Sequence, residues 1–143
     1  MGAFVADAAI KKMLLAGKAV KSAKVVILGL TFKENCPDTR NSKVEDIIVR
    51  LREYGVDPVG VDPWASQEDA MREYGVTLSS MEEARGADCV IVAVAHGEFK
   101  AMSLADIDAL YRDMPQEEKV LIDVKGLYPI AEAKKFGFAH WRL

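Results

Sequence analysis

Short apolar runs alternate with amphipathic segments along this chain of 143 residues. The apolar runs are rich in β-branched residues and bounded by Gly or Pro, which is typical of buried parallel strands. They occupy residues 25–30, 56–61, 76–78, 89–94, 120–124 and 138–141. The segments between them favour helices and occupy residues 42–54, 65–74, 80–86, 103–112 and 130–135. This alternation predicts an α/β, Rossmann-like doubly wound fold with a mainly parallel sheet of about six strands.

One more amphipathic helix is predicted before the first strand, over residues 2–16. Its apolar side chains recur at spacings of three and four residues, and Gly17 follows as a helix stop. The strands and helices of residues 18–143 already make a complete domain, so the apolar face of this helix has no evident partner within it. We therefore expect residues 1–17 to stand outside a domain of residues 18–143 and to self-associate or pack on a neighbour.

The loop after the first strand carries the densest polar chemistry of the chain. It contains Lys33 and Arg40, and Ser42 then begins a helix with Glu45 three residues later, the spacing of a capping box. A helix N-terminus favours negative charge through its dipole and its unpaired N–H groups, and Lys43 adds a further cation. The stretch therefore predicts an anion site, at an edge of the sheet where α/β proteins bind ligands.

Other polar residues near strand ends are weaker candidates. Asp62 follows the second strand, where a dinucleotide fold places its ribose-binding acid, but residues 29–32 lack the Gly-x-Gly-x-x-Gly fingerprint. Cys36 is a lone cysteine beside a proline, for which a structural role is favoured over a nucleophilic one. His96 ends a buried strand, where a helix-start or core role is favoured over ligand contact. The spacing of His and Cys predicts no metal site.

Composition narrows the class of protein further. Half of the residues are hydrophobic and 29% are charged, with a net charge of −3, and the two signs are interspersed, so no basic field indicates nucleic acid. The apolar runs are too short to span a membrane. Two cysteines make no disulfide framework, so we expect a reducing, cytoplasmic location.

The first strand and its loop carry a family pattern. The residues are Gly29, Phe32, Lys33, Asp38, Arg40 and Ser42. This pattern resembles the start of the C-terminal, nucleotide-sugar-binding domain of the UDP-glucose/GDP-mannose dehydrogenase family. The likeness covers nearly the whole chain, through residues 123–126 to the ending at 141–143. Residues 30–38 are most similar to the branch that oxidises UDP-N-acetylhexosamines, such as the mannosamine and galactosamine forms.

The resemblance implies a function and roles for particular residues. It implies that Lys33, Lys125 and Phe32 bind a UDP-sugar, and that Arg40 reaches NAD held mainly by an N-terminal domain. Lys125 stands where related enzymes often have Arg, so planar bidentate contact is lost. The implied reaction oxidises a sugar CH2OH to a carboxylate in two hydride transfers through a Cys-bound intermediate, and its catalytic residues lie in regions that this chain lacks.

The same resemblance implies an assembly. It identifies residues 1–17 as the end of a helix that joins a central dimerisation region to this domain, so the full-length enzyme is expected to be a homo-oligomer. The isolated chain is expected to be inactive, with no catalytic residues of its own. Two alternatives stay open: a stand-alone nucleotide- or CoA-binding Rossmann module, and a small complete enzyme that uses Cys36 or His96. Binding of UDP against NAD and CoA, and turnover by the isolated chain, discriminate between them.

Overall fold

The computed structural model describes residues 2–40 and 43–143, and a parallel sheet runs through its centre. Its five strands lie in the order β2-β1-β3-β4-β5, and every neighbouring pair is parallel. They are β1 (Val25–Leu28), β2 (Val59–Val61), β3 (Cys89–Val92), β4 (Val120–Asp123) and β5 (Ala139–Arg142). The chain moves outward from β1 to β2 and then returns to β3 on the other side of β1. The strand order therefore reverses between β1 and β3, the switch point at which such sheets bind ligands.

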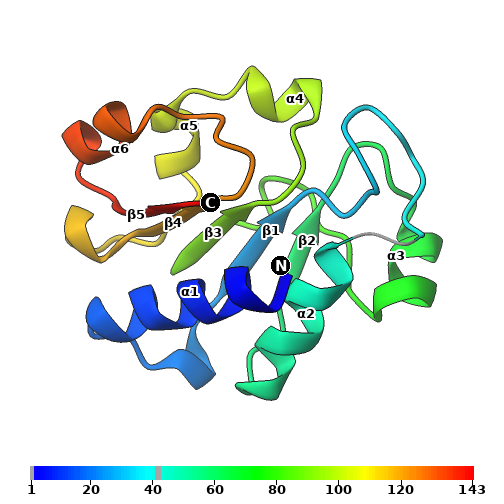
Figure 1. Ribbon diagram of the computed structural model, residues 1–143, viewed down its shortest axis with the longest axis horizontal. Helices are drawn as coiled ribbons and strands as arrows, with labels where there is room; N and C mark the ends of the chain where they lie inside the picture. The colour runs from blue at the N-terminus through cyan, green and yellow to red at the C-terminus, as the bar shows by residue number, and fades with distance from the viewer. Residues whose placement is uncertain (1, 41–42) are drawn as a thin grey trace.

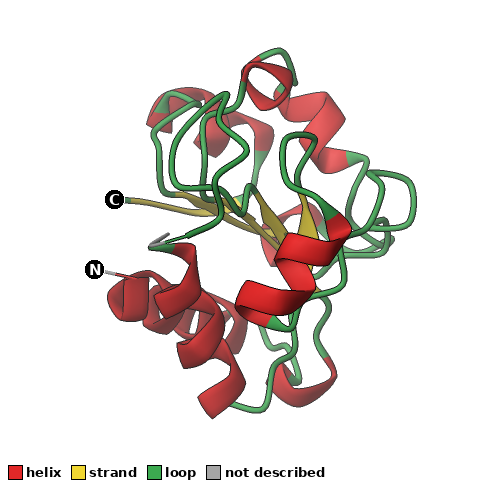
Figure 2. Cartoon of the chain, turned by 90° about the vertical axis from the view of Figure 1, so that its right-hand side faces the viewer, coloured by secondary structure: helices red, strands yellow, loops and turns green. Residues whose placement is uncertain are grey.

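Helices cover both faces of this sheet (Figures 1 and 2). They are α1 (Gly2–Leu15), α2 (Val44–Glu53), α3 (Gln67–Tyr74), α4 (Gly97–Lys100), α5 (Leu104–Asp108) and α6 (Ile130–Phe136). Two short 3-10 helices, η1 (Val20–Ser22) and η2 (Gln116–Glu118), complete the regular elements that the described residues form. Figure 1 shows α1 and α2 below the sheet, and α4, α5 and α6 above it. None of the described helices has the length and apolarity needed to cross a bilayer.

The alternation of side chains along the strands explains why two cores form. Val25 and Ile27 of β1 point into the lower core, which lies between the sheet and the helices α1 and α2. Val26 and Leu28 point into the upper core, which lies between the sheet and the helices α4 and α5. Every residue of β1, β3 and β4 is buried, as a strand covered on both faces requires. The predicted Rossmann-like α/β fold is therefore confirmed, with five strands in place of about six.

The expectation that the first helix lacks a partner in the domain is wrong. The inward side of α1 is buried in the lower core, where none of Val5, Ala9, Ile10 and Met13 is more than 4% exposed. The helix contacts α2 and the strands β3, β4 and β5. The reason is topological: α4, α5 and α6 all lie on the upper face, so α2 alone would leave the lower face of β3 to β5 uncovered. That residues 1–17 continue a connecting helix stays a prediction.

The predicted strand at 76–78 is also wrong. Val76 is buried, but the segment makes only an isolated bridge, between Leu78 and Gly60 of β2. Two backbone bonds support it: the Gly60 N–H donates to the Thr77 carbonyl, and the Ser79 N–H donates to the Gly60 carbonyl. The apolar run is too short to extend this pairing before the chain turns away at the edge of the sheet.

Helix ends match the sequence signals only in part. Ser103 and Asp106 form a capping box at the start of α5, which ends earlier than the predicted helix over 103–112, at Asp108. Ser80 and Glu83 make the same reciprocal bonds, yet residues 81–84 form a turn and not a helix. The predicted helical segments did not include α4, although a helix start was one favoured role for His96. The proposed cap at Ser42 lies outside the described residues.

Candidate functional site

A pocket of about 220 Å³ opens at the carboxyl ends of β1, β3 and β4. It is lined by Thr31, Phe32, Lys33, Lys43, Val44, Ala93, Val94 and Lys125. Thr31, Phe32 and Lys33 follow β1, and Ala93 and Val94 follow β3. Lys125 follows β4, and Lys43 and Val44 stand at the start of α2. The structure therefore brings the three predicted substrate-binding residues, Phe32, Lys33 and Lys125, to one place at the switch point. We call this site the lysine pocket.

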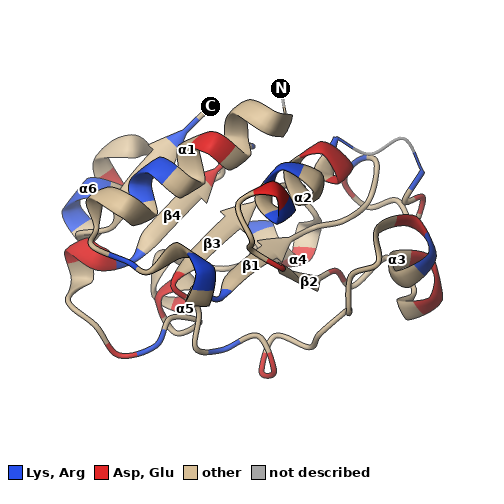
Figure 3. Cartoon of the chain, turned by 90° about the horizontal axis from the view of Figure 1, so that it is seen from below, with Lys and Arg blue, Asp and Glu red and all other residues tan. Residues whose placement is uncertain are grey.

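The lysine pocket concentrates positive charge. Its lining includes the three lysines Lys33, Lys43 and Lys125 and no carboxylate. Within residues 2–40 and 43–143, none of these ammonium groups has a salt-bridge partner. Acidic and basic residues alternate along the helices below the sheet (Figure 3), so this gathering of one sign is local. An anion with several oxygens would relieve the mutual repulsion of the lysines.

Among the three lysines of the lining, Lys43 is the one to which sequence reasoning assigned no substrate contact. It was recognised only as a cation near a helix start. Its position follows from α2, whose first residue, Val44, packs in the lower core and directs the helix N-terminus to the edge of the sheet. The signal available in the sequence was a third lysine beside a predicted anion site.

A close approach of two loops shapes the floor of the pocket. Gly29 has φ +103°, and a Cβ at this position would lie 2.5 Å from the Cβ of Val94. Glycine is therefore required for the loops after β1 and β3 to come together. The Phe32 N–H donates to the Asp38 carbonyl at 2.7 Å, which closes the loop and leaves the Phe32 ring 57% exposed. An aromatic face thus lies beside the three charges.

A smaller, more apolar cavity adjoins the lysine pocket. It has about 110 Å³ and shares four lining residues with the lysine pocket. Its lining is Gly2, Val5, Lys43, Val44, Ile47, Ala93, Val124, Lys125 and Leu143. The helix α1 therefore contributes to the wall of the site as well as to the core, and the first described residue and the last residue of the chain meet there.

Arg40, the predicted cofactor contact, does not line the lysine pocket. Its guanidinium makes a bidentate pair with Asp38, with Nε–Oδ1 at 3.1 Å and Nη2–Oδ2 at 3.2 Å, and its side chain is 74% exposed. The hydrogen bond from Arg40 lowers the pKa of the Asp38 carboxyl. The carboxylate thus holds a guanidinium that is exposed to solvent.

Asp62 and His96 belong to a buried network. The carboxylate of Asp62 accepts hydrogen bonds from the backbone N–H groups of Leu30, Trp64 and Ala65, and it lies 3.0 Å from Nε2 of His96. These contacts occupy both oxygens, so Asp62 does not serve as a ribose-binding acid. His96 is fully buried and precedes the first residue of α4, which confirms its interpretation as a helix-start and core histidine.

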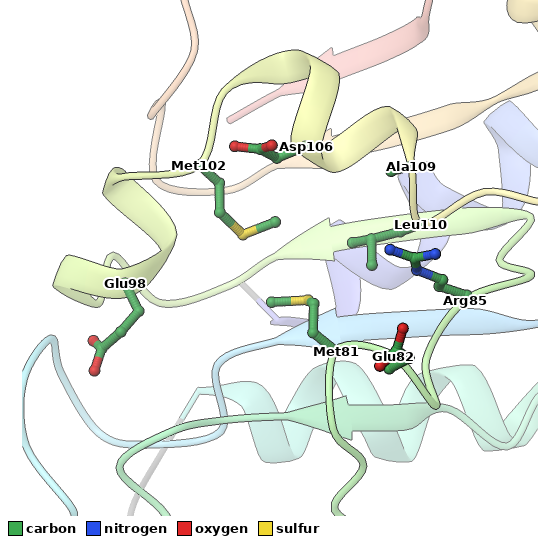
Figure 4. A pocket seen from close by; sticks show the side chains of 8 residues that line it. All are labelled: Met81, Glu82, Arg85, Glu98, Met102, Asp106, Ala109 and Leu110. Carbon is green, nitrogen blue, oxygen red and sulfur yellow. The ribbon is translucent and has the colours of Figure 1, made fainter.

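A larger pocket, of about 400 Å³, lies on the upper face (Figure 4). It is lined by Met81, Glu82, Arg85, Glu98, Met102, Asp106, Ala109 and Leu110. A further pocket of about 430 Å³ adjoins it through Met81 and Glu98. The lining of the first of these pockets includes three acidic residues and one arginine, so its charge disfavours a diphosphate. Charge, not volume, makes the lysine pocket the better candidate for an anionic ligand.

Comparison with known proteins identifies the family to which the chain belongs. Residues 26–130 match the UDP binding domain of the UDP-glucose/GDP-mannose dehydrogenase family. The match covers well over half of the chain, so the chain belongs to this family. The resemblance noted in the loop after β1 is thereby confirmed.

Particular relatives come from bacteria and archaea. The chain is 46% identical over 127 residues to the UDP-N-acetyl-D-glucosamine 6-dehydrogenase of Pseudomonas aeruginosa, covering 89% of this chain and 29% of that protein. It is 38% identical over 133 residues to the enzyme of the same name from Salmonella typhi, covering 93% and 30%. The crystal structure of an NDP-N-acetyl-D-galactosaminuronic acid dehydrogenase from Methanosarcina mazei has the same fold, with a TM-score of 0.81 at 21% identity over 99% of this chain and 28% of that one. The chain thus spans about 30% of the length of these relatives.

Proposed function

We propose that this chain is the C-terminal nucleotide-sugar-binding domain of a UDP-N-acetylhexosamine 6-dehydrogenase, and that the lysine pocket receives the diphosphate of a UDP-sugar. The observation that carries the proposal is the meeting of Lys33, Lys43 and Lys125 at the switch point without a carboxylate among the lining residues. Family membership supports the ligand class. The names of the P. aeruginosa and S. typhi relatives support the N-acetylhexosamine branch.

In this proposal the three predicted substrate-binding residues have separate tasks. Lys33 contacts the diphosphate, Lys125 contacts the nucleotide from the opposite loop, and the exposed ring of Phe32 supplies an apolar wall. The pocket has about 220 Å³, below the roughly 300–1,000 Å³ of pockets that enclose a drug-sized ligand. The chain therefore supplies one wall of the substrate site, and other parts of a longer protein supply the rest.

The residues of this chain do not fit NAD as its main site. Residues 29–32 lack the glycine fingerprint, and the Asp62 carboxylate is held by backbone N–H groups and His96. In the proposed enzyme NAD accepts hydride from the sugar CH2OH at a site held mainly by another domain. The exposed guanidinium of Arg40, which lies outside the lysine pocket, contacts that cofactor. The whole enzyme works as a cytoplasmic homo-oligomer, and the isolated chain produces no NADH from NAD and a UDP-sugar.

Titration of UDP into the ¹⁵N-labelled chain tests the ligand. Because the ligand touches only one wall, we expect an affinity on the order of millimolar, with shifts centred on Lys33 and Lys125. Loss of a charge-assisted contact in Lys33→Ala is expected to weaken binding about tenfold or more. Lys135→Ala is the matched control, because Lys135 is an exposed lysine on α6, above the sheet.

Three results would contradict the proposal. Equal UDP affinity of Lys33→Ala and the unmodified chain would make Lys33 an ordinary surface lysine. Tighter binding of NAD or CoA than of UDP, measured by competition, would favour the stand-alone nucleotide- or CoA-binding module instead. Production of NADH by the purified chain would show that it is a complete enzyme.

A further inference from the structure

A single buried imidazole contacts the Lys33 loop on both sides of the lysine. The Thr31 hydroxyl donates to the Lys33 carbonyl at 3.0 Å, and Nε2 of His96 lies 3.0 Å from the same hydroxyl oxygen. On the other side, the Asn35 N–H donates to Nδ1 of His96 at 2.9 Å. Residues 33 and 34 are therefore held between two contacts that converge on one side chain. Lys33 itself remains exposed.

These partners assign the tautomer of His96. A backbone N–H is only a donor, so Nδ1 must accept from Asn35 and carries no hydrogen. Nε2 then carries the hydrogen, which points to Oδ2 of Asp62 and to the Thr31 oxygen, both at 3.0 Å. The side chains of His96 and Asp62 are 0% exposed, so water does not replace either partner. The neutral imidazole with hydrogen on Nε2 is the form that fits all of these contacts.

Asn35 completes the link to the neighbouring loop. Its side-chain Oδ1 accepts from the Gly97 N–H at 2.9 Å, so Asn35 and residues 96–97 exchange two hydrogen bonds. Asn35 has φ +54°, and it is the non-glycine residue with a positive φ in the described part of the chain. Asparagine tolerates this conformation better than most residues, which allows its backbone and its side chain to face the start of α4 together. The rings of Trp64 and Phe99 pack against His96, with centroids at 6.1 and 5.6 Å.

We infer that His96 is a positioning residue for the lysine pocket, and that its Nδ1 acceptor holds the Lys33 loop in the geometry that binds a diphosphate. The inference rests on the proposed function for the identity of the ligand. The two nitrogen atoms of His96 differ in importance. If Nε2 were lost, Asp62 would still accept from three backbone N–H groups. If Nδ1 were lost, the Asn35 N–H would lose the acceptor that it has here, so this bond matters most. A preorganised loop presents the Lys33 ammonium without the cost of ordering it on binding.

Two substitutions separate the two nitrogen atoms of His96. In His96→Asn, the amide oxygen can replace Nδ1 as the acceptor, but the shorter side chain places no atom at the position of Nε2. The amide nitrogen in His96→Gln can replace Nε2 as donor but leaves the Asn35 N–H without its acceptor. We expect His96→Asn to keep UDP affinity within about threefold, and His96→Gln to weaken it about tenfold and to speed hydrogen exchange of the Asn35 amide. His140→Asn, at the second of the two histidines, is the control and should change neither quantity.

The imidazole ¹⁵N spectrum tests the hydrogen bonds of His96 directly. We expect His96 to show a protonated Nε2 and an unprotonated Nδ1, and the spectrum of His140→Asn assigns the signals. A hydrogen on Nδ1, or equal loss of UDP affinity in His96→Asn and His96→Gln, would overturn the inference. If the unmodified chain does not bind UDP, the proposed function fails, and the inference is decided by whether Asn35 exchange is faster in His96→Gln than in His96→Asn.

A substitution in the exposed loop decides the matter if the buried variants do not fold. Asn35→Gly keeps the backbone N–H and the positive φ, but it removes the acceptor of the Gly97 N–H. We expect faster exchange of the Gly97 amide and weaker UDP binding, by about threefold, because one of the two bonds of the link is lost. Unchanged exchange and affinity in Asn35→Gly would show that the link does not hold the Lys33 loop.

Discussion

Truncation of Met13 tests whether α1 is part of the domain core. The Met13 side chain is 0% exposed in the core beneath the sheet. Burial of a methionine stabilises a fold by about 1.5–3 kcal/mol, and the cavity left by Met13→Ala brings the expected loss to about 2–5 kcal/mol. Such a loss is a large part of the roughly 5–15 kcal/mol that separates native from unfolded domains. If α1 stood outside the domain, Met13→Ala would leave the free energy of unfolding of the domain almost unchanged.

Urea unfolding followed by far-UV circular dichroism measures this loss. A decrease of about 3 kcal/mol, with an m-value of about 2 kcal/mol per M, lowers the midpoint by about 1.5 M urea. The matched control is Leu14→Ala on the same helix, because Leu14 is 60% exposed, and its substitution should change stability by no more than about 0.5 kcal/mol. A midpoint for Met13→Ala equal to that of Leu14→Ala would refute the packing of α1 described here.

Two further predictions concern reactivity and pH. Burial raises the pKa of the Cys89 thiol, whereas Cys36 is only half-buried. Iodoacetamide at pH 8 should therefore modify Cys36 and leave Cys89 unmodified until urea unfolds the chain. Peptide mass spectrometry measures both reactions, and equal labelling of the two cysteines would contradict this prediction. Hydrogen bonds from Arg50 and then Tyr54 lower the pKa of Asp7, so this contribution to stability is present above the unfolded pKa of about 3.9 and is lost as pH falls through the lowered folded value. Asp7→Asn should therefore lower the urea midpoint at pH 7, with a difference that closes in acid; a difference independent of pH would exclude the ionised carboxylate as its cause.

In the proposed enzyme this chain supplies only one wall of the substrate site. The chain supplies three lysines, an aromatic ring and a loop held from beneath by a buried histidine, and it covers about 30% of the length of its relatives. In the proposed enzyme these residues recognise the charge of the diphosphate. The apolar cavity beside the lysines includes Gly2 and Val5, so α1 connects the core to the wall of the site. A change in the packing of α1 would therefore reach the lysine pocket through Lys43 and Val44.

Local sequence patterns determined the elements and the general place of the site. Buried β-branched runs followed by helical spacing predicted β1, β3 and β4 as strands covered on both faces, and the burial of every residue in them confirms it. The sequence also placed Lys33 and Lys125 after strand ends, where the direction of parallel strands brings loops to one edge. These inferences succeed because they depend on the spacing of apolar residues and on the direction of the chain, and both are determined by residues close together in the sequence.

Contacts between distant segments required the tertiary structure. The partner of α1 could not be predicted, because it depends on α4, α5 and α6 all lying on the upper face and leaving the lower face of β3 to β5 for another helix. The run at 76–78 had the composition of a strand, but only one bridge to Gly60 forms at the sheet edge. His96 was placed in the core from the sequence, yet its bond to Asn35 joins residues 61 positions apart. Such pairings follow from how the layers pack, and only the folded chain decides which donors meet which acceptors.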